Sequence, residues 1–441
     1  MDKRKRISIV LLVATLAAIY FPKFLCPLNE LDGAWFFSQA PSVLQGGGMF
    51  NYFTNFHTPA FYGWLQIPFA THLTSISGVH LFYFTFSLLL IYTLASRIDS
   101  THLFLSIPLL ILTDKVILLQ RPEPVILILA LVLYQLWNTM LNRKWYWGVA
   151  ISVFLCSLHI PPGLLAVAAV FCYEGWLIQR DRRYVYLGIG GIILLLSFYL
   201  LFPENIFIST LEFRLTHFTV KTPLTFLAYS GVTLVALLTI IRKFITKKFI
   251  VNYLILLAFA LVLGAYYYLL LLFIPPLLII LYNPKKLPQL KWLFIPIAFN
   301  LVVNVIHPLY THIENSEYCM QVNEIIEKTS KLETEYLSHS EIPHFFIENN
   351  IAPASFIQGT NCRMLLFEPD KLQIFDKMVS GDKIAITTSQ KLKQFQNYAH
   401  QNNLSILQPN EVLHPVEGKL SLQSLYTQRT DSLGLWILTV L

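Results

Sequence analysis

Long apolar runs recur along most of this 441-residue chain, and they limit its possible folds more than any other feature. Each run has roughly 13 to 25 residues, which is close to the length that a helix needs to cross a bilayer. Since 55% of the residues are hydrophobic and only 13% are charged, most of the chain needs lipid rather than water around it. The predicted spans are 7–25, 78–96, 100–117, 124–141, 146–160, 163–179, 184–202, 222–241, 249–264, 266–282 and 290–308.

Basic residues orient these eleven predicted spans. Residues 3–6 are Lys-Arg-Lys-Arg, and we interpret the run that follows them as an uncleaved signal anchor with a cytoplasmic N-terminus. The inner segments then hold 17 Lys and Arg residues and the outer connections hold five, as the positive-inside rule requires. The net charge of +7 therefore fits a membrane topology and does not indicate a nucleic-acid partner. The expected location is a bacterial inner membrane, with the endoplasmic reticulum as the alternative.

Composition divides the chain into two predicted domains. Residues 1–308 form the transmembrane domain, whose first outer loop covers 26–77. Residues 309–441 replace Leu and Phe with Lys, Glu, Gln and Asn, and an odd number of spans places them outside the cell or in the periplasm. The expected fold is thus a polytopic α-helical membrane protein with a small extracytoplasmic α/β domain. Its predicted elements are strands at 383–388, 404–407 and 434–440 and a helix at 390–401.

Ionisable residues are scarce inside the predicted spans. Glu174 is the main exception, and it lies near the cytoplasmic end of its span. There it can reach the interface or pair with a nearby arginine such as Arg180. Transporters and proton pumps generally hold their substrate or coupling ion with ionisable groups in mid-span, so this scarcity argues against a transporter.

Acidic residues and histidines gather instead at the predicted outer boundary. Asp32 follows the first span, Asp114 ends the third and Glu123 opens the fourth. Asp32 and Glu123 also suit simple helix caps. A carboxylate at this depth can act as a general base toward a hydroxyl or amide that attacks a sugar carbon. A second carboxylate and a neutral imidazole, such as Glu123 and His57, can bind a divalent metal cation, the one cofactor that this set suggests.

Three basic residues on the same predicted face can bind a lipid-borne phosphate. Arginine is favoured for such contacts because its guanidinium donates two parallel hydrogen bonds. The alternative is an ordinary interfacial anchor. The candidates for donor-phosphate binding are Arg121, Arg214 and Lys221.

Four motifs on the predicted outer face resemble motifs of a known superfamily. They are 31–36 (Leu-Asp-Gly-Ala-Trp-Phe), 57–62 (His-Thr-Pro-Ala-Phe-Tyr), 121–124 (Arg-Pro-Glu-Pro) and 159–165 (His-Ile-Pro-Pro-Gly-Leu-Leu). With these motifs and eleven predicted spans, the chain resembles the GT-C superfamily of membrane glycosyltransferases. That superfamily includes protein O-mannosyltransferases, aminoarabinose transferases and oligosaccharyltransferases.

The resemblance implies an inverting transferase that uses a polyprenyl-phosphate-linked sugar at the outer leaflet. By position, Asp32 would be the catalytic base, and Glu123 or Asp114 would be the second acidic residue. Several members carry Asp-Glu where this chain has Asp32-Gly33. The expected partners are the lipid-linked donor, membrane lipids and an acceptor that is a lipid, a glycan or a protein. The alternatives are a flippase or transporter of a lipid-linked glycan, and a non-catalytic assembly subunit of the membrane.

Overall fold

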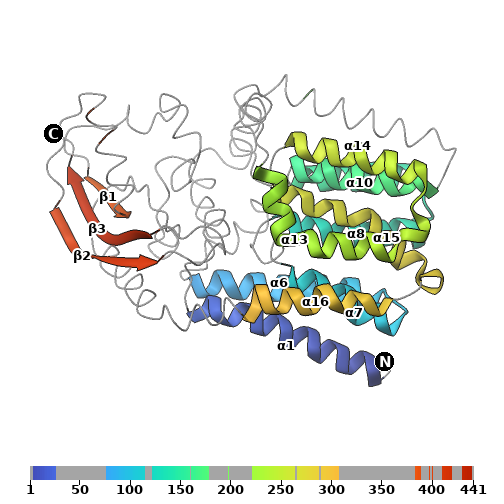
Figure 1. Cartoon of the computed structure of the whole chain (residues 1–441), viewed down its shortest axis with the longest axis horizontal. Coiled ribbons are helices and arrows are strands. Elements are labelled where there is room, and N and C mark those ends of the chain that lie inside the picture. Colours follow the sequence, from blue (N-terminus) through green and yellow to red (C-terminus); the bar gives the residue numbers. More distant parts are fainter. Residues whose placement is uncertain are drawn as a thin grey trace. The chain divides into compact units, whose positions relative to one another are not determined.

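Helices dominate the part of the chain that the computed structural model describes (Figure 1). The described residues are 3–25, 76–114, 122–158, 160–177, 197, 221–263, 266–287, 290–306, 383–388, 397, 400, 410–419 and 430–439. Within them the α-helices are α1 (Lys3–Leu25), α6 (Ile76–Ser96), α7 (Thr101–Thr113), α8 (Pro122–Thr139), α9 (Trp145–Leu158), α10 (Ile160–Leu177), α13 (Lys221–Ile240), α14 (Lys247–Leu263), α15 (Ile274–Tyr282) and α16 (Phe294–Leu301). Shorter segments are the 3-10 helices η4 (Arg242–Phe244), η5 (Tyr266–Phe273), η6 (Pro284–Lys286) and η7 (Leu290–Leu293) and the π-helix η8 (Val302–Ile306).

Ten of the eleven predicted spans coincide with helical segments. The last two are composite, because η5 continues into α15 and η7 continues through α16 into η8. The predicted span 184–202 lies outside the described residues. The helical state of these ten segments is therefore confirmed.

Helix length is a separate question from helix position. Within the described ranges, one stretch, Pro223–Ile240 in α13, is both long and apolar enough to cross a bilayer. The 13 residues of α7 rise about 20 Å, whereas the hydrocarbon core of a bilayer is about 30 Å thick. The eleven-span membrane topology therefore stays a prediction.

Prolines mark the start of several helices. Pro122 opens α8, Pro161 and Pro162 lie in the first turn of α10, and Pro275 and Pro276 lie in that of α15. The first turn tolerates proline because its backbone N–H groups have no acceptor within the helix. Hence α8 and α10 begin two or three residues before the predicted spans.

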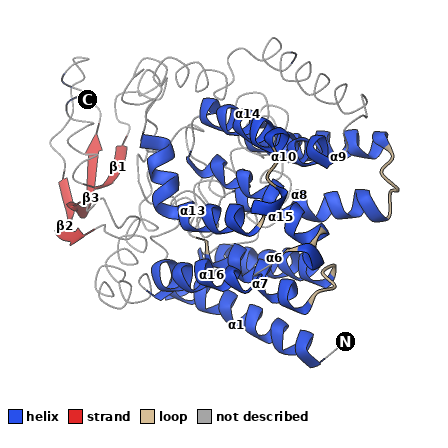
Figure 2. Cartoon of the chain, turned by 45° about the vertical axis from the view of Figure 1, so that its right-hand side comes forward, coloured by secondary structure: helices blue, strands red, loops and turns tan. Residues whose placement is uncertain are grey.

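Helix α10 packs against neighbouring helices on several of its sides. It packs against α8, α9, α14 and α15, and Figures 1 and 2 show α14 running alongside it. At Gly163 the backbones of α10 and α9 nearly touch, since an added Cβ would lie 2.3 Å from the Leu155 carbonyl oxygen. On another side of the helical unit, α16 packs against α7 and α13.

The helical unit has a mostly apolar interior that contains a few polar groups, and it also exposes many large apolar side chains. Val10 of α1 is 66% exposed, Val235 of α13 is 61% exposed and Leu254 of α14 is 56% exposed. By contrast, Asp114 and Glu123 are completely buried. Large apolar side chains exposed in such number are unusual for a water-soluble protein.

Three strands form a separate antiparallel sheet. They are β1 (Lys383–Thr388), β2 (Asn410–Lys419) and β3 (Thr430–Thr439), and β3 lies between the other two. The helices from α7 to η8 belong to one compact unit and the strands to another, so each is described by itself. The boundary predicted at 308/309 remains a prediction.

The sheet agrees in part with the predicted α/β domain. The predicted strands 383–388 and 434–440 correspond to β1 and to the end of β3. The predicted helix 390–401, except for positions 397 and 400, and the predicted strand 404–407 lie outside the described residues. The sequence did not predict β2, which contains Pro415 and Gly418, residues that usually argue against a strand. Here β2 is an edge strand, and its register shifts between Leu413 and Val416, where an edge accommodates a proline.

Candidate functional site

The structure describes two of the predicted acidic site residues, Asp114 and Glu123. They flank the 115–121 connection between α7 and α8, and both side chains are completely buried. Lys221, a predicted phosphate ligand, is the first residue of α13. The other predicted site residues lie outside the described part of the chain, namely Asp32, His57, Arg121 and Arg214.

Glu123 occupies the first turn of α8, between two prolines. A carboxylate there interacts favourably with the positive end of the helix dipole. Ionised carboxylates are rarely buried completely, because removal from water disfavours the charged form. The position therefore places an acid in the interior at the start of α8, and the predicted capping role stays a prediction.

Asp114 directly follows the last residue of α7, with an extended backbone at φ −69° and ψ 130°. Its Oδ1 accepts a hydrogen bond of 2.8 Å from the hydroxyl of Ser230, which lies on α13, 116 residues further along the chain. Both side chains are fully buried. The bond therefore joins the end of α7 to the interior face of α13.

Two more hydrogen bonds connect the same helices to α16 and η8. The Asn300 amide donates to the Thr233 hydroxyl at 3.0 Å, joining α16 to α13. The Asn304 amide donates to the backbone carbonyl of Thr113 at 3.0 Å, joining η8 to α7. Each pair of helical segments is thus linked once, which closes a loop of contacts. We call this cluster the three-helix polar ring, and its members are Thr113, Asp114, Ser230, Thr233, Asn300 and Asn304.

Local geometry explains why the ring residues face the same interior. Ser230 and Thr233 are three residues apart on α13, and Asn300 and Asn304 are four apart, so each pair shares one helix face. All four side chains are at least 95% buried. The π-helix η8 begins between the two asparagines, and π-helical turns occur frequently at functional sites.

A third buried carboxylate, Glu174 of α10, lies in a different environment. The Tyr134 hydroxyl of α8 donates a hydrogen bond to its Oε1, and the Arg143 guanidinium lies 3.8 Å from that oxygen. Arg143 also bonds to the hydroxyl of Tyr134 at 3.3 Å and to the Asn138 side chain. We call these four residues the Glu174 network. The predicted partner Arg180 lies outside the described residues, and the described partner is Arg143.

The turn between α8 and α9 brings Arg143 to this position. Asn142 and Arg143 adopt left-handed backbone conformations with φ of 49° and 52°. For a non-glycine residue this conformation costs about 1–2 kcal/mol. The Trp137 indole stabilises the turn by donating to the Lys144 carbonyl at 2.9 Å. Glycine adopts this backbone conformation at a lower cost, but the turn has Arg143 there, and its guanidinium lies close to Glu174.

The sequence reasoning missed the ring because it searched the spans for ionisable residues. Hydroxyl and amide residues such as Ser230 and Asn304 carry no charge, so a search for ionisable groups does not find them. A usable signal was present in their spacing, with polar residues at i and i+3 in one predicted span and at i and i+4 in another. That pattern puts polar groups on one face of each helix.

Among the described residues, no three His, Cys, Asp or Glu side chains come together as a metal site. Glu123 is the described member of the predicted metal pair, and its partner His57 lies outside the described ranges.

Comparisons with protein-family models, with curated proteins and with solved structures found no match to this chain. Its chemistry is therefore inferred from its own residues.

Proposed function

We propose that this chain is a multi-pass membrane glycosyltransferase that moves a sugar from a polyprenyl-phosphate-linked donor to an acceptor at the outer face. The observation that carries the proposal is the complete burial of two acids, Asp114 and Glu123, at the two ends of one short connection. This connection contains Arg121, and the positive-inside rule predicts that it lies on the outer side.

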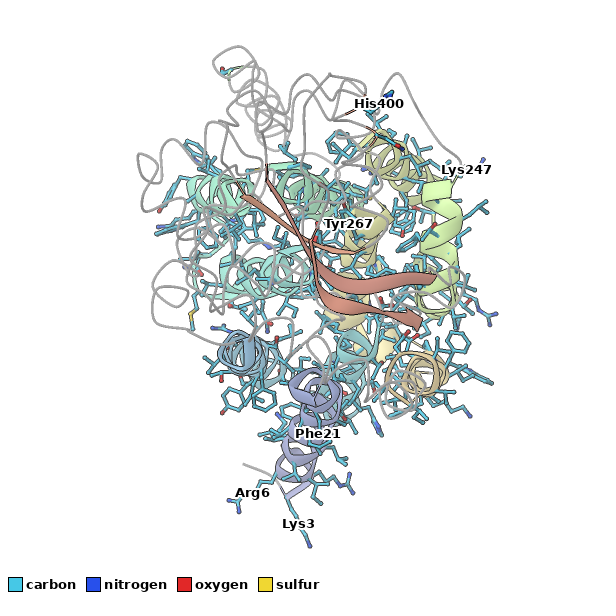
Figure 3. The ribbon with its side chains drawn as sticks, turned by 90° about the vertical axis from the view of Figure 1, so that its left-hand side faces the viewer. Lys3, Arg6, Phe21, Lys247, Tyr267 and His400 are labelled. Carbon is cyan, nitrogen blue, oxygen red and sulfur yellow. The ribbon has the colours of Figure 1, made fainter. Side chains whose placement is uncertain are left out.

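The membrane part of the proposal is supported by the exposed apolar side chains. Exposed residues such as Val235 and Leu254 are more favourable in lipid than in water. Polar groups between helices are typical of a helical bundle in lipid. Figure 3 shows Lys3 and Arg6 extending from the N-terminal end of α1, as expected of a cytoplasmic basic end. Helices shorter than the bilayer are accommodated by local thinning and by flanking residues.

In the proposed reaction, Asp32 removes a proton from the acceptor hydroxyl or amide as that group attacks the anomeric carbon. The new glycosidic bond forms on one face of the sugar while the bond from the anomeric carbon to the phosphate oxygen breaks on the other. The configuration inverts, and the polyprenyl phosphate leaves with the bonding electron pair. Arg121, Arg214 and Lys221 stabilise the charge that develops on the phosphate. Glu123, or Asp114 in its place, is the second acid of the site. The predicted metal, if held by Glu123 and His57, supplies Lewis-acid stabilisation of the phosphate.

Transfer from a radiolabelled polyprenyl-phosphate sugar tests the catalytic part. We expect purified wild-type protein to form labelled product and Asp32→Asn to lose at least about 100-fold in rate, as removal of a general base does. Asp99→Asn is the matched control, because Asp99 is exposed and lies on the predicted inner side. Equal rates for wild type and Asp32→Asn would remove Asp32 from the proposed role.

Reporter fusions test the membrane part separately. Fusions that end at residues 143 and 242 should report the cytoplasm, and one that ends at residue 220 should report the outer side. The same reading at all three positions would contradict the topology.

A second candidate is a flippase of lipid-linked glycans, and the three-helix polar ring favours it because transporters keep polar groups between their helices. Movement of a labelled lipid-linked glycan across proteoliposomes, without any new glycosidic bond, would support this candidate over the transferase.

A further inference from the structure

We propose that one end of the helical unit binds the headgroups of anionic phospholipids. This surface consists of residues 3–6 at the start of α1, the turns 97–100 and 140–144, residues 242–248, and the 3-10 helices η6 and η7. We call it the basic end. Its basic residues are Lys3, Arg4, Lys5, Arg6, Arg97, Arg143, Lys144, Arg242, Lys243, Lys247, Lys248, Lys285, Lys286 and Lys291.

Two hydrogen bonds join the start of α1 to the first of these turns and to α8. The Lys5 ammonium donates to the backbone carbonyl of Ile98 at 3.3 Å, which brings the start of α1 to the α6–α7 turn. The Gln135 amide of α8 donates to the carbonyl of Arg97 at 2.9 Å. Because Gln135 lies in the last turns of α8, the α8–α9 turn that follows it lies at the same end.

Contacts around Glu174 add α10 and α15 to this end. Arg143 of the α8–α9 turn lies 3.8 Å from Glu174, which is in the last turn of α10. The ring of Tyr282, the last residue of α15, lies 5.4 Å from the ring of Tyr134 in α8. Since η6 begins two residues after Tyr282, its lysines lie at the same end as the α8–α9 turn.

Packing places residues 242–248 and η7 there as well. A Cβ added to Gly175 of α10 would lie 3.5 Å from the Asn252 amide nitrogen, so the start of α14 lies beside the end of α10. Helix η7 packs against α7 and α13. Since Asn304, at the other end of the same composite segment, bonds to Thr113 at the end of α7, η7 lies toward the start of α7 and the turn before it.

The charge of the basic end sets the charge of its partner. Among the described residues of the helical unit, Asp99 is the one exposed acidic residue, because Asp114, Glu123 and Glu174 are buried. Most of the lysines and arginines of the basic end are exposed. A surface that gathers so many positive charges attracts an anionic partner, and the anionic lipids of a cytoplasmic leaflet attract such polybasic segments.

Exposed tryptophans at the basic end favour a lipid as this partner. Trp145 and Trp147 lie in the first turn of α9, directly after Lys144, and Trp292 follows Lys291 in η7. All three indole rings are exposed, and the Lys291 ammonium lies 6.0 Å from the centroid of the Trp292 ring. Tryptophan is enriched at the membrane–water interface, where its ring lies at headgroup depth. The basic residues beside these rings are then at the depth of the lipid phosphates.

This inference rests on the membrane part of the proposed function and not on the transferase reaction. The reporter fusions test the membrane topology without reference to lipid charge, and the lipid measurement needs no sugar donor or acceptor. A failure of one proposal is therefore distinguishable from a failure of the other.

Spin-labelled lipids test the inference directly. The purified full-length protein is reconstituted in phosphatidylcholine vesicles that contain a trace of spin-labelled phosphatidylglycerol or of spin-labelled phosphatidylcholine. Electron paramagnetic resonance then measures the fraction of each label that the protein immobilises. We expect phosphatidylglycerol to associate with the wild type at least about threefold more strongly than phosphatidylcholine, and 1 M NaCl should bring this ratio close to one.

Matched substitutions at exposed lysines separate charge from shape. Lys144, Lys243, Lys285 and Lys286 are changed together to glutamine in one variant and to arginine in another. The glutamine variant should lose most of the preference for phosphatidylglycerol, whereas the arginine variant keeps the charges and should keep the preference.

The salt series uses the wild type alone, so the test is decisive even if the glutamine variant fails to fold. Equal association of the two lipids with the wild type would overturn the proposal, as would a preference that 1 M NaCl or the glutamine substitutions leave unchanged. Tight binding of a labelled oligonucleotide to the protein in detergent, without any lipid preference in vesicles, would assign the basic end to a nucleic acid and would also overturn it.

Discussion

The three-helix polar ring and the Glu174 network both bury a carboxylate, but they hold it in opposite ways. The Glu174 network concentrates a phenol and a guanidinium on one carboxylate oxygen, and Arg143 remains 38% exposed at its edge. The ring distributes three hydrogen bonds over three helical segments and consists mostly of neutral oxygens and amides. The first arrangement neutralises a charge and fixes a turn. The second joins three helical segments through hydrogen bonds of hydroxyl and amide groups.

Aromatic packing strengthens this contrast. Tyr134 meets the rings of Tyr173 and Tyr282 edge to face, with centroids 5.5 Å and 5.4 Å apart. Such pairs contribute about 0.5–1.5 kcal/mol beyond the area they bury. The Glu174 network therefore lies against a rigid aromatic cluster, which holds the phenol of Tyr134 in place and fits a structural role.

The largest expected effect comes from Gly163→Ala, which should disrupt the packing of α10, the helix that carries Glu174. The new Cβ would lie 2.3 Å from the Leu155 carbonyl oxygen and 2.6 Å from the Cys156 Cα, and backbone atoms cannot rotate away. We expect α9 and α10 to separate, with a loss of about 3 kcal/mol or more in the free energy of unfolding. Unfolding by SDS titration in mixed micelles measures this change.

Gly175→Ala, on the same helix, is the matched control for Gly163→Ala. Its Cβ would meet the Asn252 amide nitrogen at an ordinary 3.5 Å. Since alanine favours a helix by about 1 kcal/mol over glycine, Gly175→Ala should be neutral or stabilising. Comparable losses in both variants would show that the close approach of α9 and α10 is not the cause.

The sequence predicted the local features of these two regions, but not the contacts between residues that lie far apart in the chain. Apolar runs placed ten helical segments correctly, because the run length and its proline boundaries are local properties. The ring was not foreseen, since its bonds join residues 67, 116 and 191 positions apart. No local pattern indicates which helices will meet.

Backbone conformation explains two other features that the sequence did not predict, the contact of Arg143 with Glu174 and strand β2. The predicted pairing of Glu174 with Arg180 stays a prediction, since Arg180 lies outside the described residues. The described contact is with Arg143, which a turn with two left-handed residues, Asn142 and Arg143, brings near Glu174. Strand β2 was not predicted because it contains Pro415, and within a sheet a proline fits an edge strand such as β2. The burial of Asp114 and Glu123 was likewise invisible in a sequence that placed both at the ends of spans.

The next effect in size is expected for Tyr134→Phe. This change removes the hydroxyl that donates to Glu174 and leaves a buried carboxylate oxygen without that bond. A hydrogen bond to a charged group is worth about 1.5–3 kcal/mol, so we expect a loss of about 2 kcal/mol in the same unfolding measurement. Tyr146→Phe, at a tyrosine that is 45% exposed, should change stability by less than about 0.5 kcal/mol. If the two variants were equal, the bond to Glu174 would not be stabilising.

Arg143→Met sharpens the comparison by testing the charge alone. Methionine keeps a Cβ at the left-handed position, so the backbone cost stays while the ion pair is lost. Because Arg143 is partly exposed and lies 3.8 Å from the carboxylate, water screens the pair, and we expect a loss of about 1 kcal/mol. Its neighbour Lys144→Met should change stability by less than about 0.5 kcal/mol. A loss as large as that of a fully buried pair, about 3–5 kcal/mol, would instead mean that Glu174 depends on Arg143 for its charge.

The smallest effect is expected within the ring, and a double-mutant cycle of Thr233→Val and Asn300→Leu measures it. Hydrogen bonds between helices in lipid contribute about 0.6 kcal/mol on average, because partly unfolded helices in a membrane also find partners. We therefore expect a coupling energy near that value. A coupling energy of zero within error would show that the bond between Thr233 and Asn300 contributes no net stability.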